Sequence, residues 1–185
     1  MDMKRIGIIL MMLVTMGLLA GCGDEADLTI LLMPGPQQVI PTEVTDQVKA
    51  QLQQQLGSEK KVEVNASAMY SIQKLIAELA VGANDLMVVP EDDMKNFAKN
   101  SGTTPLEDIL DKEKYKRGFV EGTVFVKDAS GKEQEKKEEH LYAIPIHEMK
   151  MFKSIGFALE NLFVIIPSNA PHPDLAKQVL KSMAE

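Results

Sequence analysis

The chain has 185 residues, a formal net charge of −7, one cysteine and no tryptophan. This length suits one domain with its own hydrophobic core, and the acidic balance argues against nucleic-acid binding and against a polybasic attraction to anionic lipid. The single cysteine excludes an internal disulfide and a cysteine metal cluster.

The N-terminal segment has the pattern of an export signal. Residues 1–5 are short and basic, and residues 6–20 are almost wholly apolar. Such a run is shorter than the roughly 20 residues of a comfortable membrane span and is typical of a secretory signal. The run ends in Leu19-Ala20-Gly21-Cys22, an order that resembles the lipobox of bacterial lipoprotein signals.

The lipobox resemblance implies cleavage before Cys22 and acylation of its sulfur and its new amino terminus. Several acyl chains would make the anchoring stable, because one chain alone binds a bilayer only marginally. We therefore expect a signal peptide at 1–21, a lipidated tether at 22–26 and one domain at 27–185. The alternative is an uncleaved anchor helix in which the cysteine occurs by chance.

Strands and helices alternate in the first half of the domain. Short apolar or alternating runs predict strands at 27–33, 61–66 and 85–89. Apolar stripes with helical spacing, bounded by capping residues, predict helices at 42–56, 72–81 and 91–101. Alternation of this kind indicates parallel strands joined by right-handed crossovers.

The second half is less regular. Its patterns predict a capped helical turn at 104–110, strands at 118–127, 141–146 and 162–166, a charged arm or loop at 132–139, and a last helix at 171–183. The stretch 118–146 therefore has the character of a β-hairpin.

The stretch LIAELAVGANDLMVVPEDDMKNFAKNSGTTPLEDIL at 75–110 resembles the first lobe of bacterial extracellular solute-binding proteins of ABC transporters. The segment LYAIP at 141–145 and the strand and helix of 161–183 are similar to further segments of that family. The resemblance implies an α/β fold, a three-layer single lobe with a mostly parallel sheet of the periplasmic-binding-protein type. Family members are usually about twice this length, so we expect a truncated single-lobe relative with the hairpin around 118–146 as an insertion.

A candidate ligand site follows from the expected strand order 2-1-3. In an open α/β sheet, ligands bind at the carboxyl ends of strands, near the point where the strand order reverses. Here the walls would be 34–37 and 90–93, with 67–71 nearby. The candidate ligand-binding residues for a polyol or a cation are Gln37, Tyr70, Glu91 and Asp92. The alternative is that the prolines only end strands and the acids only cap a helix.

The sequence offers little for catalysis. None of the three histidines, His140, His147 and His172, has metal-site spacing with another, and no nucleotide-binding or nucleophile motif is present. We expect no metal, no cofactor and no enzyme activity.

The first hypothesis for function is a lipoprotein of the cell membrane, on the extracytoplasmic face, that binds or presents a small solute to an ABC transporter. The second is a scaffold that docks an envelope or transporter protein through the hairpin without binding a solute.

Overall fold

The computed structural model describes residues 25–128 and 131–185. The expected signal peptide, Cys22 and the first part of the tether lie outside these residues. In chain order the elements are β1 (Leu28–Leu32), α2 (Thr42–Leu56), β2 (Val62–Ala66), α3 (Ile72–Val81), β3 (Leu86–Pro90), α4 (Glu91–Lys99), η1 (Lys116–Gly118), β4 (Phe119–Lys127), β5 (Glu133–Leu141), β6 (Ala143–Pro145), η2 (Ile146–Glu148), α5 (Lys150–Ser154), β7 (Leu162–Ile165) and α6 (Pro173–Ala184).

The main sheet has five strands in the order β2-β1-β3-β7-β6. Strands β2 and β3 both pair in parallel with β1, as the alternating first half predicted. Strand β7 is antiparallel to both β3 and β6, so four of the five strands point the same way. The predicted mostly parallel α/β fold and the strand order 2-1-3 are confirmed.

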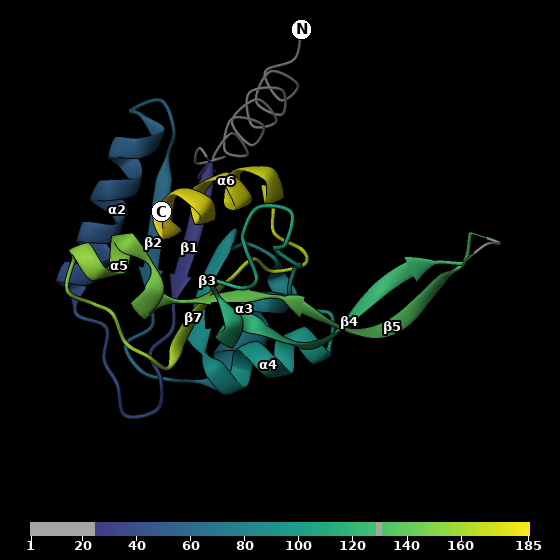
Figure 1. Ribbon diagram of the computed structural model, residues 1–185. Coiled ribbons are helices and arrows are strands. Elements are labelled where there is room, and N and C mark those ends of the chain that lie inside the picture. The colour runs from purple at the N-terminus through teal and green to yellow at the C-terminus, as the bar shows by residue number, and fades with distance from the viewer. Residues whose placement is uncertain (1–24, 129–130) are drawn as a thin grey trace, which may run out of the picture.

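Helices cover both faces of this sheet (Figure 1). Alternate residues of β1 divide between two cores. Leu28, Ile30 and Leu32 pack with apolar side chains of α2, α5 and α6. Leu31 packs on the opposite face with residues of α3 and α4. This division produces the predicted three layers, because successive side chains of a strand point to opposite faces.

Local capping explains why α3 has the length that was predicted. The Ser71 hydroxyl accepts a hydrogen bond from the Lys74 backbone N–H, and Gly82 ends the helix with a φ of 68°. A left-handed residue of this kind is where glycine is most favoured. Helix α5 was not predicted, because its five residues are too few to show a helical period.

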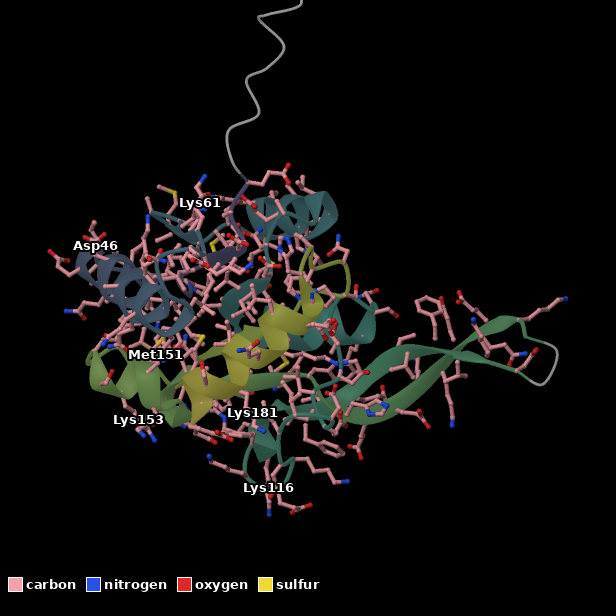
Figure 2. The ribbon with its side chains drawn as sticks, turned by 90° about the horizontal axis from the view of Figure 1, so that it is seen from above. Asp46, Lys61, Lys116, Met151, Lys153 and Lys181 are labelled. Atoms are coloured by element: carbon pink, nitrogen blue, oxygen red, sulfur yellow. The ribbon has the colours of Figure 1, made fainter. Side chains whose placement is uncertain are left out.

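The predicted hairpin exists and forms a separate two-stranded sheet of β4 and β5, with Phe119 opposite Leu141 and Lys127 opposite Glu133. It projects from the body as an arm in both views (Figures 1 and 2). The end of the predicted stretch differs, because 143–145 forms β6 and joins the main sheet at its edge. The hairpin insertion is therefore shorter than 118–146.

The base of the arm is held tightly against the body. A Cβ atom added at Gly118 would lie 1.8 Å from the Ala143 carbonyl oxygen, so only glycine fits there. The Thr123 hydroxyl donates to the Lys99 carbonyl at 2.7 Å, and the Ser101 hydroxyl donates to the Thr123 carbonyl at 3.0 Å. The proximal half of the arm is thereby fixed to the end of α4.

Candidate functional site at the carboxyl edge of the sheet

The loops that follow β1, β2 and β3 lie together at one edge of the sheet, which we call the carboxyl edge. In Figure 1 the loop after β1 lies at the bottom, at the opposite end of the molecule from the start of β1. In the strand order β2-β1-β3, the switch point at which ligands bind in open α/β sheets lies at this edge, between β1 and β3.

A hollow of about 440 Å³ opens at this edge, between the loop after β1 and the loop after β2. We call it the carboxyl-edge hollow, and it is lined by Val39, Ile40, Thr42, Thr45, Ala66, Ser67 and Ala68. Its volume is within the range of small-molecule sites. Thr45 is part of this lining, and its hydroxyl oxygen is buried without a hydrogen-bond partner, which is rare for a buried polar atom.

Apolar side chains stand exposed around the same edge. Val39 is 68% exposed and Met69 is 71% exposed, although both are large apolar residues. Ser67 stabilises the loop after β2, because its hydroxyl donates to the Met69 carbonyl at 2.9 Å. The edge therefore combines a mostly apolar hollow, which contains a few hydroxyl-bearing residues, with exposed apolar side chains, a composition suited to covering a small ligand.

Tyr70 lies beside a buried carboxylate. Its hydroxyl donates to Asp93 Oδ1 at 3.3 Å, while Asp93 Oδ2 is buried without a partner. Asp93 is only 4% exposed, and this burial raises the pKa of its carboxyl group above the ordinary range. Burial, together with the nearby Asp93 charge, raises the pKa of Tyr70 as well. The structure thus brings together Tyr70, a predicted ligand-binding residue, and Asp93, which was expected only as part of the wall at 90–93.

The Glu91 carboxylate is already ion-paired and is not free to bind a solute. Its carboxylate pairs with Lys95 Nζ at 2.7 Å and with Arg117 Nη2 at 2.6 Å. The Lys95 hydrogen bond, and then that of Arg117, lower the pKa of Glu91. Arg117 also stacks over the Phe163 ring, with Cζ 5.1 Å from the ring centroid. Glu91 therefore holds η1 against α4, and a solute would compete with two cations for it.

Gln37 and Asp92 are both exposed at the carboxyl edge. Gln37 has a φ of 62°, whereas its neighbour Gln38 makes the fixed contacts of this loop. Gln38 Oε1 accepts from the Gly35 N–H at 3.0 Å, and its amide donates to Asn161 Oδ1 at 2.9 Å. Gln38 is thus the residue that ties the loop after β1 to the start of β7.

Asp93 could have been recognised from helical spacing. It lies on the same face of α4 as Met94, Phe97 and Ala98, all of which are buried. A carboxylate on the apolar stripe of a helix is expensive to bury and therefore points to a special environment. No comparable signal in the sequence marks Thr45, because its isolation depends on how α2 meets the loop after β2.

The raised pKa of Asp93 predicts a pH-dependent stability. Because the folded chain holds this proton more tightly than the unfolded chain, the stabilisation is complete below the unfolded pKa near 3.9. It is lost as the pH rises through the raised folded pKa. We expect Asp93→Asn to gain stability relative to the original chain between pH 4 and pH 7, measured by urea unfolding.

The exposed Asp46, on α2, provides the control. Asp46→Asn should follow the pH profile of the original chain, since it removes an exposed charge and leaves the surroundings of Asp93 unchanged. If the two variants changed in parallel with pH, the account of Asp93 would be wrong.

The histidines are spread over the molecule. His140 Nδ1 lies 2.9 Å from Glu107 Oε1 at the base of the arm, and His172 Nδ1 lies 3.2 Å from Asp85 Oδ1. Within residues 25–128 and 131–185, no group of three or more His, Cys, Asp or Glu residues is arranged to hold a metal ion. In the same ranges, no helix has the length and apolar character needed to cross a membrane.

Comparisons with known proteins gave structural similarities alone. No protein-family model and no curated protein matches the chain. An extracellular solute-binding protein family 1 from Alicyclobacillus acidocaldarius is similar at a TM-score of 0.43 and 16% identity, over 66% of this chain and 29% of that one. The maltose-binding periplasmic protein of Listeria monocytogenes, solved with maltose, is similar at a TM-score of 0.37 and 14% identity, over 66% and 27%.

This chain spans less than a third of the length of either of these two proteins.

Proposed function

We propose that this chain is a membrane-anchored lipoprotein on the extracytoplasmic face, whose α/β lobe binds a small solute at the carboxyl edge without catalysis. The lipobox pattern before Cys22 supports the anchor and the location. The carboxyl-edge hollow, whose lining includes Thr45 with its buried and unpartnered hydroxyl, is the observation that carries the binding role.

The predicted ligand residues contribute unequally to this proposal. Tyr70 offers a hydroxyl beside Asp93, and Gln37 and Asp92 are accessible at the same edge. Glu91 is already ion-paired and takes part only if a cationic or hydroxylated solute displaces Lys95 or Arg117. A polyol fits this set of donors and acceptors better than a bare cation does, because two of the three carboxylates are already paired or buried.

The test compares solute-dependent stabilisation in the original chain and in two variants, Thr45→Val and Ser182→Ala. Thr45→Val removes the buried hydroxyl from a residue that lines the hollow, with little change in shape. Ser182→Ala removes an exposed hydroxyl on α6, which bonds to Gln55 far from the carboxyl edge. The proposal expects the stabilisation to fall in Thr45→Val and to persist in Ser182→Ala. Equal stabilisation in all three chains would place the solute elsewhere.

A second candidate function is protein docking by the arm, and one observation favours it. Phe125 is 59% exposed near the end of the arm, where it lies opposite Glu135 with no body element covering it. An exposed aromatic side chain on a projecting hairpin is suited to insertion into a partner. Such docking to an envelope or transporter protein needs no solute.

A shortened arm tests the second candidate. Deleting 124–127 and 133–136 removes four directly opposed pairs and leaves Thr123 opposite Lys137. Since four is an even number, every remaining side chain keeps its face. If the arm docks a partner, the shortened chain should fold normally and lose that partner in a crosslinking experiment. Retention of the same crosslinks would exclude the arm as the docking element.

A further inference from the structure

The first residues that the structure describes lie at the edge of the sheet opposite the candidate site. Glu25 and Ala26 precede β1 and line a hollow together with Val81, Gly82 and Ala83 at the end of α3. We call this end of the molecule the amino edge. Strands β1, β2 and β3 have five residues each, so roughly 17 Å separates the amino edge from the carboxyl edge.

The chain between this edge and the proposed lipid is very short. Only Gly23 and Asp24 lie between Cys22 and Glu25. Fully extended, the three steps from Cys22 to Glu25 span at most about 11 Å. This step rests on the proposed lipidation of Cys22. An anchor at that residue would hold the amino edge at the bilayer surface.

The outward face of α3 is apolar beside this tether. Ile76 is 55% exposed and Val81 is 74% exposed. The small side chains Ala77, Ala80 and Ala83 are exposed on the same stretch. Residues 76, 77, 80 and 81 share one side of the helix, since positions four apart are neighbours on a helix surface. Scattered exposed apolar residues are ordinary, but a cluster next to an anchor marks a surface that can contact lipid.

The charges near the amino edge do not attract an anionic bilayer, because Glu25, Asp27 and Glu63 outnumber the two lysines there. Lys60 Nζ pairs with Asp27 Oδ1 at 2.6 Å, and Lys61 Nζ pairs with Glu63 Oε1 at 3.4 Å. Lys61 is labelled in Figure 2, which shows the molecule from the side on which β1 begins. On α3, Glu78 accepts from the Asn84 amide at 3.0 Å, and Lys74 is exposed. Contact with lipid therefore depends on the tether and on apolar side chains.

We infer that the amino edge, with the exposed apolar face of α3, lies on the bilayer that holds the lipid of Cys22. The carboxyl edge then faces away from that bilayer. A solute bound in the carboxyl-edge hollow is exposed to the extracytoplasmic space and not to the surface of the anchoring membrane. A protein that takes the solute must extend beyond the bilayer by about the length of the domain, or must approach from the opposite side.

Paired fluorescent labels test this orientation on the full, membrane-anchored chain. Val81→Cys and Val39→Cys place a thiol-reactive bimane at the amino edge and at the carboxyl edge, at two positions with similar exposure. The lipid on Cys22 leaves each variant with one reactive thiol. The chains are placed in phosphatidylcholine and phosphatidylglycerol vesicles that contain a nitroxide-headgroup lipid. We expect the Val81 label to be quenched several-fold more strongly than the Val39 label.

The outcomes separate this inference from the function on which it rests. Equal quenching, or stronger quenching at Val39, in a chain that sediments with vesicles would overturn the orientation and leave the anchor intact. A chain that fails to sediment would overturn both. Quenching of the Val81 label could instead depend on the density of protein in the vesicle and not on the amount of quencher lipid. That result would assign the exposed face of α3 to contact with a second copy of the chain and would overturn the inference.

Discussion

Replacing Cys22 by serine should release the chain from the membrane almost completely. A serine hydroxyl cannot replace the thiolate that accepts the diacylglyceryl group. Each buried methylene of an acyl chain contributes about 0.8 kcal/mol to membrane binding, so the loss of all chains leaves no stable attachment. The measurement is sedimentation of membranes, followed by mass spectrometry of the mature amino terminus.

Gly21→Ala provides the control for Cys22→Ser. It keeps a small residue before the cysteine, so cleavage and sedimentation with membranes should be retained. If Cys22→Ser were still cleaved at the same place and still sedimented, the lipobox interpretation would be wrong. The uncleaved anchor helix would then be the better explanation of residues 6–20.

Phe163→Ala should be the most destabilising of the simple truncations in the main sheet. Phe163 is fully buried in β7, where it is paired with Val89 of β3 on one side and with Pro145 of β6 on the other. The guanidinium of Arg117 also stacks over the Phe163 ring. Truncating a buried phenylalanine costs about 3 to 5 kcal/mol. In a domain of this size that loss lowers the melting temperature by roughly 6 to 20 °C.

Phe125→Ala removes the same atoms from the exposed arm and is the matched comparison for Phe163→Ala. Its effect on stability should stay within about 0.5 kcal/mol, as for other surface substitutions. Both values are obtained from thermal unfolding followed by circular dichroism. A comparable loss in the two variants would mean that the arm packs against a surface that the structure leaves open.

Local patterns in the sequence were sufficient to predict the first half of the fold. Each unit from β1 to α4 combines a short apolar strand, a stop signal and a capped helix, and these features depend on neighbours within a few residues. The hydrogen bond of the Ser71 cap and the left-handed Gly82 show this directly. The strand order 2-1-3 was expected and is observed, although the handedness of the crossovers alone does not determine it.

The second half depended on contacts that no local pattern contains. Strand β7 pairs with β3 across more than seventy residues, and its antiparallel direction could not be predicted from its apolar run. The turn expected at 104–110 is a single turn, in which the Ile109 and Leu110 N–H groups both donate to the Leu106 carbonyl. The Leu106 N–H donates to the Leu141 carbonyl, a contact that ties the start of this turn to the end of β5.

The loops after β1, β2 and β3 meet at one edge of the sheet as expected, because strand order determines which loops meet. The hollow, however, lies between the loops after β1 and β2, and not in the expected crevice between β1 and β3. The role of Glu91 was not visible, because Arg117 comes from a segment 26 residues further along the chain. The isolation of Asp93 Oδ2 is likewise a property of packing, which the sequence indicates only by placing a carboxylate on an apolar helix face.

A thermal-shift screen tests the central claim of solute binding most directly. The Cys22→Ser chain would be screened against sugars, oligosaccharides, amino acids, peptides and divalent metals. A ligand at one hundred times its dissociation constant adds about 2.7 kcal/mol, or roughly 5 to 10 °C in a domain of this size. We expect one class of hydroxylated solute to produce such a shift, and Thr45→Val to reduce it. A folded chain that no solute stabilises would contradict the claim and favour docking by the arm.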